Sequence, residues 1–279
     1  MSRVTLVEVG PRDGLQNQPQ FVATPDKIKL IDALSASGLT QIEVASFVSP
    51  KWVPQMADAA AVCAGIARDP AVKYSALTPN LRGFEAANEA GVDSVAVFAS
   101  ASEGFSQKNI NCSIKESLER FFPIFDHSNV PIRGYVSCVV ECPYDGLIAP
   151  DAVAEVTMHL LDMGCYEVSL GDTIGRATPQ QVDRLLTCIL AQIPAGKLAG
   201  HFHDTHGQAL DNIDVALAAG IRVFDAAVGG LGGCPFAPGA AGNVATETVL
   251  AHLQDCGFDT GVDADALEQA AAIALEVKG

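Results

Sequence analysis

The sequence has few basic residues, and this shortage limits the partners that the chain can bind. Lys and Arg total 17 against 33 Asp and Glu, so the formal net charge is −16. Nucleic acids and anionic membrane surfaces attract basic proteins, and this balance therefore argues against both as partners. An anionic substrate would have to be held by a local cluster of cations or by a metal ion.

Long apolar runs and closely paired cysteines are also missing. No apolar run reaches the roughly 20 residues that cross a bilayer. An apolar stretch begins at Val4, so we expect no signal or transit peptide. The eight cysteines include no Cys-x-x-Cys pair, and several lie in apolar runs. We therefore expect mostly buried thiols in a reducing cytoplasm rather than a disulfide framework.

Hydrophobic residues are abundant, at 49% of 279, which is enough for one large core. Short apolar runs alternate with segments of helical spacing about eight times. This pattern predicts an α/β fold of one domain over residues 1–279, a parallel sheet closed into a (β/α)8 TIM barrel with extra C-terminal helices. The predicted strands are 4–9, 41–48, 72–78, 94–100, 132–140, 167–173, 198–204 and 223–229, and the helical stretches begin at Thr24 and recur at roughly 81–90, 114–126, 151–163, 179–191, 208–219, 243–256 and 264–277.

An open, doubly wound parallel sheet is the alternative architecture. Such a sheet usually carries a Gly-x-Gly-x-x-Gly loop after its first strand, where it binds a dinucleotide. Here the corresponding segment is Gly-Pro-Arg-Asp-Gly at 10–14. We therefore favour the closed barrel.

Two histidines, His201 and His203, lie near the end of the seventh apolar run. Side chains alternate along a strand with a period of two, so both rings face the same way and can bind one metal ion. Two core histidines held by hydrogen bonds are the alternative, but burial of two polar rings needs compensation. Asp204 faces the other way and is better placed to orient a ligand than to be one.

Carboxylates lie at the ends of other apolar runs, where the chemistry of such barrels takes place. Asp13 is the best candidate for a carboxylate ligand, although a solvated Arg-Asp turn explains it equally well. Glu43 lies between two apolar residues, and if it points into the barrel it needs a partner such as Arg12. Asp172 ends the sixth run, and the direction of its side chain stays open. Imidazole and carboxylate ligands together suit Mg, Mn, Co and Zn.

The segment 229–243 is rich in glycine. Six glycines surround Cys234, which predicts a lid loop with a reactive thiol over the barrel mouth. A flexible loop with an incidental thiol is the alternative. Asn243 either caps the next helix or offers its amide oxygen to a metal ion.

Eight stretches spread over nearly the whole chain carry the features described so far. They are GPRDGLQNQ (10–18), IEVASFVSPKWVPQMAD (42–58), LTPNLRGFEAA (77–87), KNINCS (108–113), GYVSCVVECPYDG (134–146), MGCYEVSLGDTIG (163–175), HFHDTHGQAL (201–210) and GLGGCPFAPGAAGN (230–243). Together these stretches resemble the DRE-TIM metallolyases, and among them the family of lyases that cleave 3-hydroxy-3-methylglutaryl-CoA.

The resemblance implies a barrel enzyme that cleaves 3-hydroxy-3-methylglutaryl-CoA to acetyl-CoA and acetoacetate with a divalent metal ion, Mg or Mn. In the family's pattern Arg12 steadies the thioester enolate and Cys234 delivers a proton to it. Asp172 is the first choice for the base and Glu43 the second. The metal ligands in that pattern are Asp13, His201, His203 and Asn243.

Some positions depart from the family's pattern, and they leave the acyl group open. Gln18 and Pro19 stand where the family commonly has Glu and Lys, and Phe236 replaces a Tyr. A lyase for a longer isohexenyl analogue is therefore the alternative enzyme, and a catalytically silent barrel kept for binding is the alternative class. The resemblance further implies an acyl-CoA substrate, a homodimer or higher homo-oligomer, and a cytoplasmic role in leucine degradation.

Overall fold

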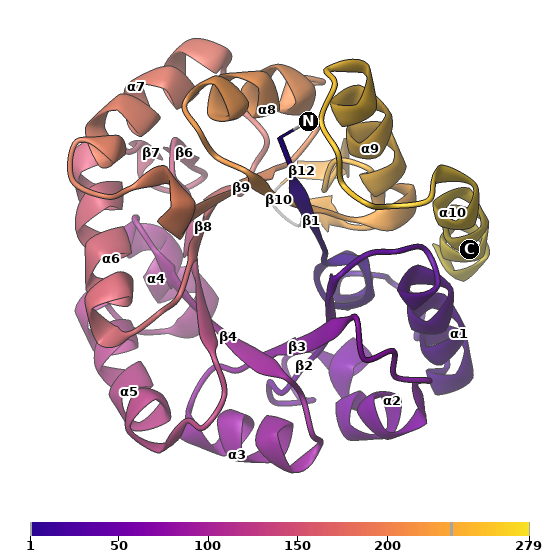
Figure 1. Cartoon of the computed structure of the whole chain (residues 1–279). Helices are drawn as coiled ribbons and strands as arrows, with labels where there is room; N and C mark the ends of the chain where they lie inside the picture. Colours follow the sequence, from indigo (N-terminus) through magenta and orange to yellow (C-terminus); the bar gives the residue numbers. More distant parts are fainter. Residues whose placement is uncertain (1, 235–236, 279) are drawn as a thin grey trace.

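Eight parallel strands form a closed barrel, and the helices lie around its outside (Figure 1). The computed structural model describes residues 2–234 and 237–278, and for 233–241 only the backbone is considered. Around the barrel the strands follow the order β1-β10-β9-β8-β5-β4-β3-β2. They are β1 (Thr5–Glu8), β2 (Gln41–Ser46), β3 (Lys73–Leu77), β4 (Ser94–Ser100), β5 (Ile132–Ser137), β8 (Val168–Asp172), β9 (Leu198–Phe202) and β10 (Val223–Ala226).

Every barrel strand lies within one of the eight predicted runs, and the predicted TIM barrel is confirmed. The strands are buried on both faces, which explains why they read as nearly continuous apolar runs. In β9, for example, all five residues are buried. Parallel pairing in register sets His201 beside Gly171 on one side and Asp225 on the other, so the carboxyl ends of neighbouring strands lie at one level.

Ten helices occur in the described part of the chain. The sequence pattern missed two of them, α2 and α4. The seven residues of α2 are apolar at almost every position, and the eight of α4 include few apolar ones, so neither shows the alternation of faces that marks an amphipathic helix. The helices are α1 (Thr24–Ser35), α2 (Ala59–Gly65), α3 (Leu81–Glu89), α4 (Glu103–Ile110), α5 (Ile114–His127), α6 (Pro150–Met163), α7 (Pro179–Leu190), α8 (Ala209–Ala218), α9 (Thr246–Asp255) and α10 (Ala264–Lys278).

Of the extra C-terminal helices that the sequence predicts, the structure shows one, α10, because α9 is the helix that follows the last barrel strand; α10 packs against α1 (Figure 1). Two short hairpins stand apart from the barrel sheet: β6 (Glu141–Cys142) with β7 (Gly146–Leu147), and β11 (Gly233–Cys234) with β12 (Ala237–Ala241). Within the described residues, no helix is long and apolar enough to cross a membrane.

The cysteines agree with the prediction of mostly buried thiols, with two exceptions. All seven whose side chains are described are free thiols, and five of them are buried. Cys188 is partly exposed and Cys256 is exposed. Both lie at the outer helices rather than in the barrel strands.

Candidate metal centre at the mouth of the barrel

Asp13 lies in a tight π-helical turn, η1 (Gly10–Gly14), which follows β1. The backbone N–H groups of residues 12, 13 and 14 all converge on the carbonyl oxygen of Val9, at 3.1, 2.7 and 3.2 Å. At Gly14 there is no room for a side chain, because a Cβ there would lie 2.6 Å from Cβ of Leu231. The turn is therefore packed tightly against the glycine-rich segment, and it directs Asp13 toward the barrel mouth.

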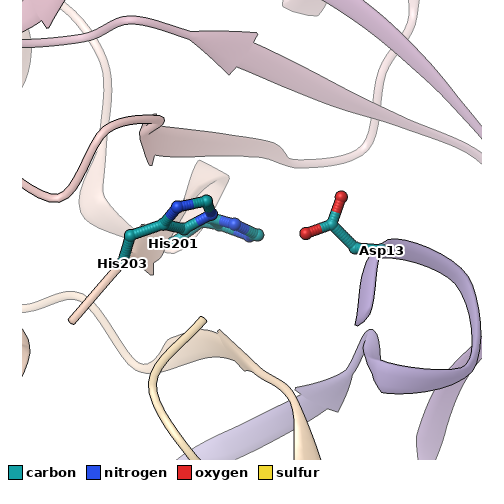
Figure 2. Close-up of side chains that lie close together, drawn as sticks. All are labelled: Asp13, His201 and His203. Carbon is teal, nitrogen blue, oxygen red and sulfur yellow. The ribbon is translucent and has the colours of Figure 1, made fainter. Parts of the chain in front are cut away.

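His201 and His203 face Asp13 across the mouth (Figure 2). One possible ligand atom from each of the three side chains lies within 4.8 Å of the other two. The two imidazole rings have their centroids 5.3 Å apart. The prediction that both rings share one face is confirmed, and Asp13 joins them from the far end of the sequence.

A buried carboxylate, Asp225 of β10, orients His201. Its Oδ2 lies 3.1 Å from Nδ1 of the ring and also accepts a hydrogen bond from Ser169 Oγ at 2.6 Å. Burial opposes the charge of Asp225, but the adjacent Arg133 holds the pKa of this carboxyl well below its usual range. For His201, burial lowers the pKa, yet the hydrogen bond and charge of Asp225 outweigh it, so the pKa is raised. The Nε2 atom of His201 is thereby left for a ligand.

His203 carries a buried nitrogen that fits a metal ligand. Its Nδ1 has no hydrogen-bond partner among the residues described. Burial, together with the neighbouring His201, lowers its pKa to about 4, so the ring is neutral at pH 7. For Asp13 burial raises the pKa, but Arg12 and the two rings outweigh it and bring the value to about 2. A neutral imidazole and an ionised carboxylate are the forms that bind metal ions.

Asn243 adjoins this triad. Its side-chain nitrogen donates to Asp13 Oδ2 at 2.8 Å and to the carbonyl oxygen of Leu231 at 3.3 Å, and its backbone pairs with His203. The helix-cap interpretation of Asn243 is wrong, because α9 begins at Thr246 and its N-cap is Ala245. The structure thus brings the fourth ligand of the resemblance beside the other three.

Arg12 pairs with Glu43, as the sequence predicts. Its Nε donates to Glu43 Oε2 at 2.6 Å, and its Nη1 donates to Asp13 Oδ1 at 2.5 Å. Burial raises the pKa of Glu43, although Arg12 opposes this shift. Oε1 of Glu43 is buried and has no hydrogen-bond partner in the described part of the chain. Tyr135, which the sequence analysis did not single out, donates to Glu43 Oε2 at 3.3 Å.

The direction of Asp172, which the sequence left open, is set by its own loop. Its carboxylate is buried and accepts the backbone N–H groups of Arg176 at 3.2 Å and Ala177 at 2.9 Å. Burial raises its pKa to about 6, and these backbone hydrogen bonds oppose the shift. Its predicted role as base stays a prediction. Asp204, expected to orient a metal ligand, instead accepts the backbone N–H of Ala209 at 3.1 Å.

Sequence reasoning also missed Glu8, at the end of β1. This buried carboxylate accepts hydrogen bonds from the N–H of Gly10 at 2.7 Å, the N–H of Val228 at 3.0 Å and the hydroxyl of Thr246 at 2.6 Å. It therefore joins the Asp13 turn to the segments on either side of the glycine-rich loop. The available signal was a lone acid within an apolar run, which Glu8 and Asp225 share.

Cys234 lies in the short hairpin of β11 and β12, where Gly233 pairs with Ala241. Its side chain lies outside the described residues, and so does the whole of Phe236. The predictions of a lid and of a reactive thiol therefore stay predictions.

The fold and these groups define the class of protein: a (β/α)8 barrel whose carboxyl-end mouth has a candidate metal triad beside a buried guanidinium. Residues 3–273 match the model of the HMGL-like family, and the chain belongs to this family.

Similar proteins carry names consistent with this membership. The 3-hydroxy-3-isohexenylglutaryl-CoA/hydroxy-methylglutaryl-CoA lyase of Pseudomonas aeruginosa is 60% identical over 96% of this chain and 90% of its own. The solved HMG-CoA lyase of Brucella melitensis is 57% identical, with a TM-score of 0.99 over 100% of this chain and 99% of its own. An HMG-CoA lyase from Acinetobacter baumannii, solved with coenzyme A and 3-methylmalate, is 39% identical. Its TM-score is 0.94 over 99% of this chain and 92% of its own.

Proposed function

We propose that this chain is a metal-dependent carbon–carbon lyase that cleaves 3-hydroxy-3-methylglutaryl-CoA to acetyl-CoA and acetoacetate. The observation that carries the proposal is that Asp13, His201 and His203 lie close together at the mouth. Arg12 donates a hydrogen bond to Asp13. Membership of the HMGL-like family and the names of the similar lyases support it.

Asp13, His201, His203 and Asn243 would hold the metal ion, and Mg²⁺ or Mn²⁺ fits a set of oxygen and imidazole ligands without a thiolate. When bound, such an ion supplies a Lewis acid for the tertiary hydroxyl of the substrate. The orphaned Nδ1 of His203 is the observation that best fits this use of the site.

Arg12 would offset the negative charge that grows on the thioester oxygen as the carbon–carbon bond breaks. Its guanidinium is held by Glu43 and Asp13, so it is already in place before the substrate arrives. A base must also take the proton of the hydroxyl. Asp172, with a pKa of about 6, is poised close to neutral pH for this task, and Glu43 with its unpaired Oε1 is the second candidate.

Cys234 would return a proton to the product enolate. Free thiols have a reference pKa of about 8.5, so a thiol is in general mostly protonated at neutral pH and can act as a general acid. The glycine-rich segment that carries it adjoins the Asp13 turn through the close contact of Leu231 with Gly14. Closure of this segment over the mouth would keep water away from the enolate.

The substrate carrier would be coenzyme A, which the similar Acinetobacter baumannii lyase binds. We further propose a homodimer or higher homo-oligomer in the cytoplasm, a compartment in keeping with the free thiols of the seven cysteines described.

A lyase for a longer acyl chain is the second candidate, because the Pseudomonas aeruginosa relative carries both substrate names. The test is to incubate the purified, Mg²⁺-loaded protein with the methyl substrate and the isohexenyl substrate and to identify the products. We expect acetoacetate and acetyl-CoA from the first, with the higher kcat/KM. The His203→Ala variant controls for contaminating lyase. Cleavage of only the longer substrate would establish the alternative, and cleavage of neither would overturn both.

A further inference from the structure

A second group of possible metal ligands lies on the outer helices of the barrel. Asp214 belongs to α8, His252 to α9, and Cys256 directly follows α9. One ligand atom from each residue lies within 4.8 Å of the other two. His252 contacts the other two residues through the same atom. Its Nε2 lies 2.7 Å from Oδ1 of Asp214 and 3.8 Å from Sγ of Cys256.

The local backbone fixes this arrangement. Cys256 follows His252 by four residues, it keeps a helical conformation at φ −77° and ψ −2°, and its N–H donates to the carbonyl oxygen of His252 at 3.0 Å. Residues four apart lie on one face of a helix. Asp214 comes from the interior of α8, which lies beside α9 (Figure 1). All three side chains therefore start from regular backbone.

The distances are close to those of a four-coordinate zinc ion. Zinc at about 2.3 Å from sulfur and about 2.0 Å from nitrogen separates these two ligand atoms by about 3.5 Å. The observed separation of 3.8 Å is near this value. The contact from Asp214 to His252 has to widen to about 3.3 Å, and the half-exposed side chain of Asp214 has room for that movement.

The chemistry of this group differs from that of the barrel mouth. It contains a thiol, whereas the candidate ligands at the mouth are carboxylate, imidazole and amide groups. Thiolate and imidazole favour Zn²⁺ over Mg²⁺. Cys256 is exposed, so an ion reaches the group without any opening of the barrel. The net charge of −16 also attracts cations to the surface.

We propose that Asp214, His252 and Cys256 form a second metal site that binds Zn²⁺ and joins α8 to α9. The three side chains leave a fourth coordination position for water. Binding displaces the thiol proton of Cys256 and replaces the hydrogen bond between Asp214 and His252. The site is independent of the proposed lyase reaction, because none of its residues belongs to the barrel mouth.

The test is a Co²⁺ titration of the full-length protein in excess Mg²⁺, followed by the charge-transfer absorption of thiolate-bound Co²⁺. Variants Cys256→Ser and His252→Gln remove one ligand each. Cys188→Ser is the matched control, because Cys188 lies 3.0 Å from the carboxylate of Asp151 but belongs to no group that could hold a metal among the described residues.

We expect the wild type and Cys188→Ser to develop the band with one equivalent of Co²⁺, and Zn²⁺ to abolish it. Cys256→Ser should lack the band, and His252→Gln should bind Co²⁺ at least about 10-fold more weakly, since loss of a ligand costs no less than loss of its support. Absence of the band from the wild type, or an equal band in Cys256→Ser, would overturn the proposal and leave only a surface hydrogen bond.

Discussion

Two arginines lie buried in the same barrel, and they are held differently. Arg133 of β5 uses every nitrogen of its guanidinium. Its Nε donates to Glu167 Oε1 at 2.8 Å, its Nη1 to the hydroxyl of Tyr135 at 2.9 Å, and its Nη2 to Asp225 Oδ1 at 2.8 Å. Through Asp225 it supports the ring of His201.

Arg12, at the mouth, uses only part of its guanidinium. Its Nε and Nη1 donate to Glu43 and Asp13, whereas Nη2 donates to no other residue in the described ranges. Burial lowers the pKa of both arginines, but the adjacent carboxylates outweigh it, so both stay charged. Arg133 is therefore fully paired and orients His201 through Asp225, whereas Arg12 keeps one donor nitrogen without a partner among the described residues, as its proposed role toward the substrate requires.

The largest expected effect is the loss of lyase activity when the proposed metal ion or one of its ligands is removed. Removal of divalent ions with a chelator should abolish cleavage, and Mg²⁺ or Mn²⁺ should restore it. His203→Ala should lose both metal binding and activity, because it removes a ligand rather than a support. Metal content and turnover of the purified variant measure this. His206→Ala, an exposed histidine of the same segment, is the control. Full activity of metal-free wild type would refute the metal requirement.

The next largest effect concerns the glycine-rich segment. Cys234→Ala should slow turnover by roughly 10²- to 10⁴-fold, which is the usual range for a lost acid–base group. Folding and metal content should stay normal, and Cys188→Ser should behave like the wild type. Steady-state kinetics on metal-loaded protein measure the loss. Unchanged turnover in Cys234→Ala would assign proton delivery to water or another group.

Substitution of each arginine in turn tests directly whether Arg12 and Arg133 have different roles. Arg12→Gln should lower kcat about 10²- to 10³-fold with little change in KM, because the charge on the thioester oxygen grows only in the transition state. Arg133→Gln should mainly lower stability, by about 3–5 kcal/mol, since it leaves Asp225 and Glu167 as buried charges.

The measurement is kcat per folded, metal-loaded molecule, combined with the free energy of unfolding from urea titration. If Arg12→Gln only lowered the stability and the folded fraction turned over normally, Arg12 would be as structural as Arg133.

The smallest expected effect is a pH dependence of stability from Glu8. Burial raises its pKa from its ordinary value of 4.5 to about 7 in the folded protein. Its contribution to the free energy of unfolding is therefore full below about pH 4.5 and is lost as the pH rises through about 7, a fall of about 3 kcal/mol.

Glu8→Gln is the matched variant, because its amide reproduces the protonated acid: the oxygen accepts from Gly10 and Val228, and the nitrogen faces Thr246. Urea titrations from pH 4.5 to 8 should show that this variant lacks the fall. An equal fall in both proteins would mean that Glu8 does not titrate in this range.

The sequence by itself determined the barrel and the core of its site. A parallel strand buried on both faces is a continuous apolar run, so all eight strands could be found without knowledge of their neighbours. The period of two placed His201 and His203 on one face. A buried Glu43 needed a countercharge, and Arg12 could therefore be predicted as its partner.

Tertiary structure alone decided which side chains meet across strands and helices. Periodicity gives the face of a strand but not the neighbour that its side chain meets, so the support of His201 by Asp225 came from the register of β9 and β10. The carboxylate of Asp172 turned to its own loop because backbone N–H groups there needed an acceptor. Asn243 lay beside Asp13, 230 residues away in sequence, because closure of the barrel brings its first and last strands together.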